Sequence, residues 1–278
     1  MKIVLMVFLG LITINMMKEM LIDDEKKIQI PVLMYHTFEN NGKFPSINTS
    51  VARFEEHLLK LKENGYTFIT SKDLVDYLND EINLPEKSIL ITIDDGYESV
   101  YNHAFPVLQK YNIIATVFPI AKHIETGERL GLSMMSWEQL REMYSSGLVE
   151  VQNHTYDLHW RLNDESGKEG LVIPYTKNGK KLSDSQHINK IKNDIEKASK
   201  TIEQEIGTDV FAFTYPYGAY NLTSEQIVSK EHIIIFTTEV GLNSKGDNPL
   251  RIKRININNN LTGDDIIKKI NSLGKTRR

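Results

Sequence analysis

The chain has 278 residues, of which 40% are hydrophobic and 25% charged, and its formal net charge is -4. These values are ordinary for a globular protein of one large or two small domains, and they indicate no basic surface for nucleic acid. There is no cysteine, which excludes disulfides, thiolate metal ligands and a cysteine nucleophile, so any metal must be held by His, Asp or Glu.

The N-terminus carries a short apolar segment, residues 3–17, between Lys2 and Lys18. Its length is below the roughly 20 residues of a membrane-spanning helix and matches the core of a signal peptide. No small-residue cleavage site follows, so an uncleaved anchor and a buried N-terminal element are alternatives. We expect residues 1–27 to be a signal peptide or membrane anchor and the only segment in contact with a membrane. A monomer, secreted or anchored at the extracellular face of a bacterial cell, is therefore expected.

From residue 28 onward, strand and helix patterns alternate along the chain. Expected strands lie at residues 28–36, 66–69, 88–93, 113–119, 148–152, 210–215, 233–238 and 251–257. Expected helices lie at residues 51–64, 71–78, 101–111, 137–146, 184–206 and 224–230 and after 262, with Ser50, Ser71 and Ser136 as N-caps. The polar residues 160–183 are expected to form an inserted loop.

This alternation predicts one parallel α/β domain over residues 28–278 rather than a β-sandwich. About seven parallel strands in a chain of this length fit a distorted (β/α) barrel better than an open sheet. A doubly wound sheet is the alternative, although no G-x-G-x-x-G follows any strand. In both folds the functional site lies at the C-terminal ends of the strands, which makes the polar residues there the candidates.

The strand at residues 88–93 runs directly into Asp94, Asp95 and Gly96. Burying an ionised carboxylate without a partner is costly, so a metal ion or a catalytic proton is expected beside this pair. An Asp-Gly turn at the end of a strand is the plain alternative.

Two further clusters follow later strands. His154 and His159 lie five residues apart in a loop and can both face one point, and two imidazoles with one carboxylate suit Zn²⁺ or a similar divalent ion. Such a set leaves coordination positions for water and substrate, as a catalytic site requires. The aromatic turn Tyr215-Pro-Tyr-Gly218 has the aromatic faces that a sugar-binding cleft needs. Taken singly, these clusters also fit surface histidines and a simple strand-end turn.

Taken together and in this order, Thr92-Ile-Asp-Asp-Gly96, the His pair and Tyr215-Pro-Tyr-Gly218 resemble the motifs of one enzyme family. That family is the polysaccharide deacetylases of carbohydrate esterase family 4, whose domain is called the NodB-homology domain. The resemblance covers residues 28–260.

The resemblance implies a role for each matching residue. Asp94 would be the general base, and Asp95, His154 and His159 would bind a divalent metal, expected to be Zn²⁺ with Co²⁺ or Ni²⁺ as alternatives. Tyr217 would offer its backbone N–H to the developing oxyanion. The substrate-binding turn would comprise Tyr215, Pro216, Tyr217 and Gly218.

Two departures from the usual family pattern are informative. The histidines are five rather than four residues apart, which resembles the branch acting on poly-β-1,6-N-acetylglucosamine of biofilms. That branch also has an N-terminal strand ending in Tyr-His, matched by Tyr35-His36, which makes His36 the candidate catalytic acid; a capped strand-end histidine is the alternative. The broader family has an arginine where this chain has Thr214, and Arg251 or Arg254 is the candidate replacement.

The function implied is metal-dependent removal of N-acetyl groups from an extracellular or cell-wall polymer containing N-acetylglucosamine. Poly-β-1,6-N-acetylglucosamine is favoured, with peptidoglycan and chitin oligomers as alternatives. Asp94 would take the proton of the attacking water, and His36 would protonate the departing amine. A catalytically inactive carbohydrate-binding module on the same fold is one alternative. A retaining glycosidase using Asp94 and Asp95 fits poorly, because its carboxyl groups should stand about 5–5.5 Å apart across the sugar.

Overall fold

The computed structural model describes residues 28–40 and 42–275. The predicted signal peptide or anchor at residues 1–27 lies outside the described residues. Within the described ranges, no helix is long and apolar enough to cross a membrane.

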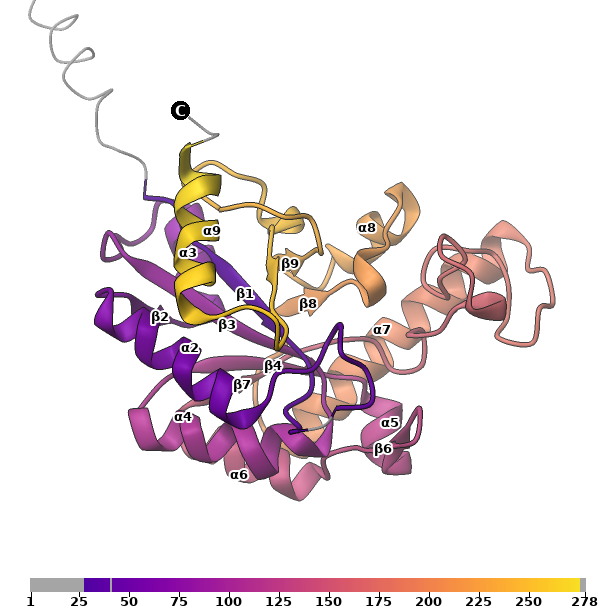
Figure 1. Ribbon diagram of the computed structural model, residues 1–278. Coiled ribbons are helices and arrows are strands. Elements are labelled where there is room, and N and C mark those ends of the chain that lie inside the picture. The colour runs from indigo at the N-terminus through magenta and orange to yellow at the C-terminus, as the bar shows by residue number, and fades with distance from the viewer. Residues whose placement is uncertain (1–27, 41, 276–278) are drawn as a thin grey trace, which may run out of the picture.

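A parallel sheet forms the centre of the fold (Figure 1). Its strands are β1 (Val32–Tyr35), β2 (Thr67–Ile69), β3 (Ser88–Asp95), β4 (Ala115–Pro119), β7 (Val149–Val151) and β10 (Ile255–Asn256). Hydrogen bonds order five of them as β10-β1-β3-β4-β7, while β2 pairs separately with β3. The prediction of a parallel α/β fold is therefore confirmed.

A second parallel pair consists of β8 (Ala212–Thr214) and β9 (Ile234–Phe236). Isolated bridges connect this pair to the rest of the chain. One bridge joins Asn153, just after β7, to Phe213 in β8, and another joins Phe236 in β9 to Ile252, three residues before β10. The small pair is thus linked at one side to the β7 end of the large sheet and at the other to the segment that leads into β10.

Helices lie around the outside of these strands (Figure 1). They are α2 (Val51–Glu63), α3 (Ser71–Leu78), α4 (Phe105–Tyr111), α5 (Ala121–Thr126), α6 (Trp137–Ser145), α7 (Asp184–Ile206), α8 (Leu222–Val228) and α9 (Gly263–Lys275). Shorter helical turns are η1 (Val100–Ala104), η2 (Leu162–Asp164), η3 (Pro216–Gly218) and η4 (Pro249–Arg251). The predicted bounds of α7 are matched at both ends.

Most helix starts follow from their capping residues, with one correction. Ser50 and Ser136 cap α2 and α6 as predicted. Helix α3, however, is capped by Thr70 and not by Ser71. The Thr70 hydroxyl accepts the backbone N–H of Asp73, and the Asp73 carboxylate accepts the N–H of Thr70, which makes a complete capping box. Ser71 lies inside the helix.

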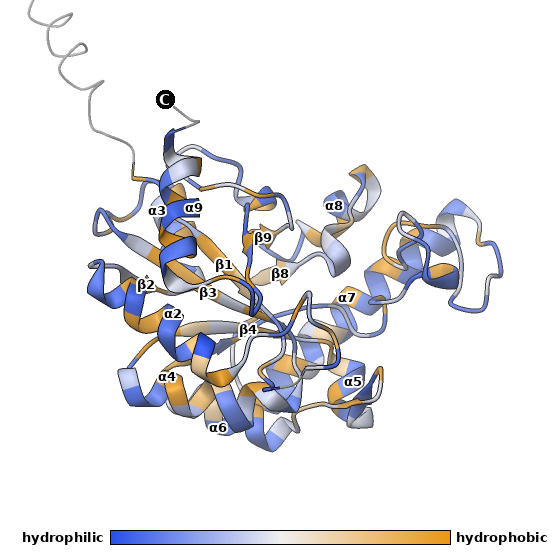
Figure 2. Ribbon diagram, viewed as in Figure 1, coloured by the Kyte–Doolittle hydropathy of each residue, from blue (hydrophilic) through white to orange (hydrophobic). Residues whose placement is uncertain are grey.

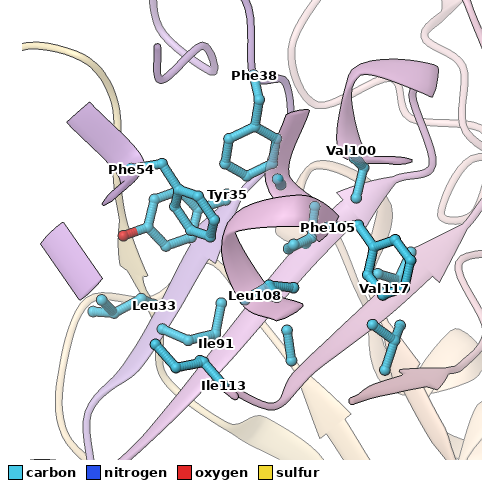
Figure 3. Close-up of a cluster of buried hydrophobic side chains, with 14 of the residues drawn as sticks. Leu33, Tyr35, Phe38, Phe54, Ile91, Val100, Phe105, Leu108, Ile113 and Val117 are labelled. Atoms are coloured by element: carbon cyan, nitrogen blue, oxygen red, sulfur yellow. The ribbon is translucent and has the colours of Figure 1, made fainter. Parts of the chain in front are cut away.

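The hydrophobic core lies between the central strands and the helices that cover them. Figure 2 shows hydrophobic residues gathered on the strands and on the inner faces of the helices. Leu33, Ile91 and Val117 come from three neighbouring strands and pack in one cluster with Phe105 and Leu108 from α4 (Figure 3). Every residue of β3 is buried, which explains why aliphatic residues predominate before its two aspartates. The strand that ends in the two aspartates is therefore held firmly on all sides.

One region forms elements that the sequence pattern does not predict. No element is expected at residues 121–133, yet the chain forms α5 and then a small antiparallel hairpin of β5 (Glu128–Arg129) and β6 (Leu132–Ser133). These elements have six, two and two residues, which is too short for hydrophobic periodicity to reveal.

The insertion at residues 160–183 is ordered around the N-terminal half of α7, beside which it projects from the body (Figure 1). Lys190 of α7 donates to three carbonyl oxygens of the insertion, those of Gly170, Ile173 and Tyr175, at 2.7, 3.1 and 3.0 Å. One side chain thus satisfies three backbone acceptors, which accounts for a fixed loop in a polar segment.

Candidate active site

The C-terminal ends of the strands meet around one cleft of about 370 Å³. Residue 36 follows the Tyr35–Ile93 pair of β1 and β3, which brings His36 beside Asp94. Seven of the nine predicted site residues line this cleft: His36, Asp94, Asp95, His154, His159, Tyr215 and Tyr217. Pro216 and Gly218 belong to the same turn and shape it without lining the cleft.

The backbone at the site is held in conformations that side chains disfavour. Asp95, Thr155 and Tyr217 have φ of 72°, 73° and 58°, in the left-handed region. Each such residue costs roughly 1–3 kcal/mol and persists only where the surrounding structure determines it, which is common at active sites.

Two glycines are required by close approach as well as by φ. A Cβ atom on Gly96 would lie 3.0 Å from Pro119 Cβ, and one on Gly218 would lie 2.0 Å from Thr238 Oγ1. The glycine that ends each motif therefore has a physical reason at its position.

Asp95, His154 and His159 form a cluster whose potential ligand atoms all lie within 4.8 Å of one another. Asp95 Oδ1 is 3.5 Å from His154 Nε2 and 3.3 Å from His159 Nε2. Asp95 Oδ1 and His154 Nε2 are buried and have no hydrogen-bond partner. His154 Nδ1 lies 2.8 Å from the carbonyl oxygen of Thr214, which accepts its proton and leaves Nε2 free for a cation. The residues present fit a divalent metal ion.

Charge and burial keep Asp95 and His159 in the protonation states that bind a metal. Burial raises the pKa of Asp95, but the charges around it, that of Arg129 first, outweigh this effect and hold the pKa well below its usual range. Burial holds the pKa of His159 well below its ordinary value. An ionised carboxylate and a neutral imidazole are what a metal requires of these two residues.

Asp94 is held by a different partner. Arg254 donates to both of its carboxylate oxygens, from Nη1 to Oδ1 at 2.9 Å and from Nη2 to Oδ2 at 2.8 Å. The arginine is buried and also donates to the Thr237 carbonyl at 2.8 Å and to the Thr214 hydroxyl at 2.9 Å. Burial raises the pKa of Asp94, but the adjacent positive charge of Arg254 opposes this effect and the pKa lies below its usual value, so the carboxylate is ionised.

Arg254, and not Arg251, therefore supplies the arginine that is missing at Thr214. Arg251 instead pairs with Glu225, and its side chain is 48% exposed. Thr214 places a hydroxyl where it accepts from Arg254, so the position contributes to holding the same guanidinium.

His36 is a half-buried imidazole beside both carboxylates. Its Nδ1 is buried without a hydrogen-bond partner. Burial lowers the pKa of His36, while the negative charges of Asp95 and Asp94 oppose that shift. The ring is therefore able to release a proton readily when it carries one.

The Tyr217 side chain is fixed between two neighbours. The centroid of its ring lies 4.3 Å from that of the His159 ring. The guanidinium carbon of Arg161 lies 4.0 Å from the centroid of the Tyr217 ring, which is a cation–π contact. Tyr215 stacks on Tyr220 at 4.8 Å. The two tyrosines thus anchor a turn that carries the proposed oxyanion donor at its centre.

Two residues that contact the site or its loop are not predicted from the sequence. Arg129, from β5, lies 3.2 Å from Asp95 Oδ2 and 2.7 Å from His159 Nδ1. Asp194, from α7, accepts the backbone N–H groups of Tyr156 and Asp157 at 2.8 Å each and so holds the loop between the two histidines. Burial raises the pKa of Asp194 to about 7. Neither residue lies in a motif, so no local signal marks it.

A family model described as polysaccharide deacetylase matches residues 81–233, which include both aspartates and both histidines of the site. The chain belongs to the polysaccharide deacetylase family. Among curated relatives, YxkH of Bacillus subtilis is 29% identical over 243 residues, covering 87% of this chain and 76% of YxkH.

Two further proteins are similar to this chain. A poly-beta-1,6-N-acetyl-D-glucosamine N-deacetylase of Staphylococcus aureus is 30% identical over 194 residues, which are 69% of this chain and 61% of that enzyme. The solved structure of IcaB from Ammonifex degensii is 30% identical, with a TM-score of 0.76 over 87% of this chain and 97% of that one. The chain thus shares its fold with a family member along nearly its whole described length.

Proposed function

We propose that this protein is a metal-dependent N-deacetylase of a polysaccharide that contains N-acetylglucosamine. The observation that carries the proposal is that the adjacent carboxylates of Asp94 and Asp95 have different partners. Asp95 faces His154 and His159 with an unpartnered oxygen, while Asp94 is ionised and held by Arg254 beside them. One carboxylate is thus available to a cation and the other to a proton.

The site residues account for each step of amide hydrolysis. A divalent metal held by Asp95, His154 and His159 would supply a Lewis acid and lower the pKa of water. Asp94 accepts the proton of the attacking water as the carbon–oxygen bond forms. The backbone N–H of Tyr217 binds the oxygen on which negative charge develops, and one such donor contributes about 10²–10³ in rate.

His36 completes the reaction. It donates its proton to the sugar nitrogen as the carbon–nitrogen bond breaks, so that acetate and a free amine are released. Its place after β1, beside Asp94, supports this role. Burial lowers the pKa of His36 and so makes the protonated ring a better proton donor, while the negative charges of both aspartates partly oppose that shift.

Poly-β-1,6-N-acetylglucosamine is the substrate that we favour, with peptidoglycan and chitin oligomers as alternatives. The name of the Staphylococcus aureus relative supports this choice, as do the spacing of His154 and His159 and the Tyr35-His36 pair. Zn²⁺ is the favoured metal, since two imidazoles and one carboxylate form a common catalytic zinc site. The apolar segment at residues 3–17 supports action outside the cytoplasm.

We also propose that the strands close into a distorted (β/α) barrel. The bridges Asn153–Phe213 and Phe236–Ile252 support this, because they link β8 and β9 to both ends of the sheet order. A barrel would place all strand ends around one cleft.

The proposal is tested with the purified full chain, stripped of metal by a chelator and then supplied with Zn²⁺, Co²⁺ or Ni²⁺. Acetate release is measured on poly-β-1,6-N-acetylglucosamine, peptidoglycan and chitin oligomers. We expect release that requires metal and is greatest on the first polymer. Glycan binding without acetate release would instead indicate a binding module, and shortening of the polymer would indicate a glycosidase.

A further inference from the structure

Arg129 is a buried cation in contact with two of the three candidate metal ligands. Its side chain is 6% exposed and reaches the site from the β5–β6 hairpin. Nη1 donates to Asp95 Oδ2 at 3.2 Å and to the Tyr97 hydroxyl at 2.6 Å. Nη2 lies 2.7 Å from His159 Nδ1. A fixed positive charge repels a metal ion bound beside it, so its presence needs a reason other than metal capture.

The contact with Arg129 gives the two oxygens of the Asp95 carboxylate different surroundings. Oδ2 accepts from Arg129, whereas Oδ1 is buried, has no hydrogen-bond partner and faces both histidines. A carboxylate can bind a cation through one oxygen or through both. Because Oδ2 is occupied by a guanidinium that is itself fixed by Tyr97, Asp95 offers a cation Oδ1 alone.

The contact with His159 sets this histidine apart from His154. A histidine that ligates a metal usually donates its other N–H to an acceptor, which raises its basicity. His154 follows this rule through the Thr214 carbonyl. The group beside His159 Nδ1 is a guanidinium, which has donors and no acceptor. His159 Nδ1 therefore accepts from Arg129, and the proton of the neutral ring lies on Nε2. A cation must displace that proton to reach His159 Nε2, so His159 lacks the support that His154 receives.

We propose that Arg129 is a positioning residue that lowers the affinity of the site for its metal. The bound ion would thereby stay electrophilic toward the acetamide. A one-oxygen carboxylate and an unsupported imidazole donate less electron density to a cation, and the guanidinium charge acts in the same direction. The part of this inference that concerns turnover rests on the proposed function; the part that concerns metal affinity does not.

A simpler role for Arg129 makes the opposite prediction. If the arginine serves only to neutralise the buried Asp95 and support the fold, its removal loosens the ligands. Metal affinity and stability then fall together, and excess metal restores the turnover. The sign of the change in metal affinity therefore separates the two roles.

The experiment compares the full chain with Arg129→Met and Arg129→Lys. Zn²⁺ dissociation constants are measured by competition with a chromophoric chelator, and kcat and KM by acetate release. The control is Arg161→Met, which also removes a positive charge from the cleft but contacts Tyr217 and Glu169 rather than a ligand. The Co²⁺-loaded proteins supply a visible spectrum, whose intensity falls as the number of ligand atoms rises.

We expect Arg129→Met to bind Zn²⁺ more tightly, by about 10–100-fold. Changes behind a metal ligand typically have this size but usually weaken binding, so the sign is specific to this proposal. The kcat of Arg129→Met should fall at least about tenfold at saturating metal, with weaker Co²⁺ absorption as Asp95 binds through both oxygens. Arg129→Lys keeps the charge without the fork and should lose turnover as well, while Arg161→Met keeps its metal affinity. Unchanged or weaker Zn²⁺ binding in Arg129→Met, or unchanged kcat, overturns the proposal.

If Arg129→Met does not fold, Arg129→Lys provides the test. The proposal then requires that Arg129→Lys binds Zn²⁺ more tightly than the unaltered chain and has a lower kcat. If the unaltered chain releases no acetate, the proposed function fails. The order of Zn²⁺ affinities and the Co²⁺ spectra still test Arg129 in that case.

Discussion

Replacing Arg254 by methionine removes the buried guanidinium that directly contacts Asp94 and leaves an unbranched apolar side chain in its place. The guanidinium makes two hydrogen bonds to the carboxylate and others to Thr237 and Thr214, all in the interior. Breaking a buried ion pair by removing one partner costs about 3–5 kcal/mol, because an uncompensated charge is left behind. We therefore expect Arg254→Met to lose about this much free energy of unfolding at neutral pH.

Arg251→Met is the matched control. This arginine also makes a bidentate pair, with Glu225 at 3.2 and 2.8 Å, but its side chain is 48% exposed. Because Arg251 is half exposed and Glu225 is largely buried, this pair should contribute more than the about 0–1 kcal/mol of an exposed pair and less than the pair of Arg254 and Asp94. The two variants are compared by urea unfolding, together with the double variant Arg254→Met/Asp94→Asn. Since the double variant leaves neither charge of this pair in the interior, it should recover most of the stability that Arg254→Met loses.

The pH dependence gives the sign of the effect. The pKa of Asp94 is lowered in the folded protein, so its ionised form stabilises the fold above the pKa of an unfolded Asp, about 3.9, and this contribution is lost as pH falls through the folded value. Without Arg254 the pKa rises. The stability deficit of Arg254→Met should thus be largest at neutral pH and shrink in acid, and the acidic limb of kcat should move to higher pH. Equal stability losses in the Arg254 and Arg251 variants, or an unmoved acidic limb, would refute the reasoning.

Two other variants test the groups around the site. Asp194→Asn offers one acceptor oxygen where two backbone N–H groups need one each. The variant should lose about 1–3 kcal/mol of the free energy of unfolding and bind Zn²⁺ about 10–100-fold more weakly. Unchanged Zn²⁺ affinity in a chelator competition would show that the loop is held by other contacts. His36→Gln should lower kcat roughly 10²–10⁴-fold at unchanged Zn²⁺ affinity, and a wild-type kcat would remove His36 from the mechanism.

Sequence alone predicts the parts of the fold that carry long patterns. Strand β3 is an eight-residue buried run, and α7 has 23 residues between Ser183 and Gly207, so both are recognisable. The hairpin β5–β6 has two residues in each strand, too few for a pattern. The residues of the predicted metal cluster are recognisable because each follows a strand and belongs to a motif.

The groups that support these residues are different. Arg254 lies 160 residues from Asp94 in the sequence, and Arg129 lies 34 from Asp95. Their contacts arise only when the strands and the hairpin come together. Asp194 reads in the sequence as one more polar position of a long helix. Direct ligands can thus be read from a motif, whereas the side chains that hold them depend on the tertiary structure.

Asp94 and Asp95 have separate roles in the proposed mechanism, and one paired measurement tests this separation directly. Zn²⁺ binding and acetate release are measured for Asp95→Ala and Asp94→Asn, with circular dichroism to verify the fold. Asp95→Ala should lose the metal. Asp94→Asn should keep it and lose turnover by roughly 10²–10⁴-fold, as expected for a general base. If both variants bind Zn²⁺ and release acetate like the unaltered chain, the central assignment is wrong.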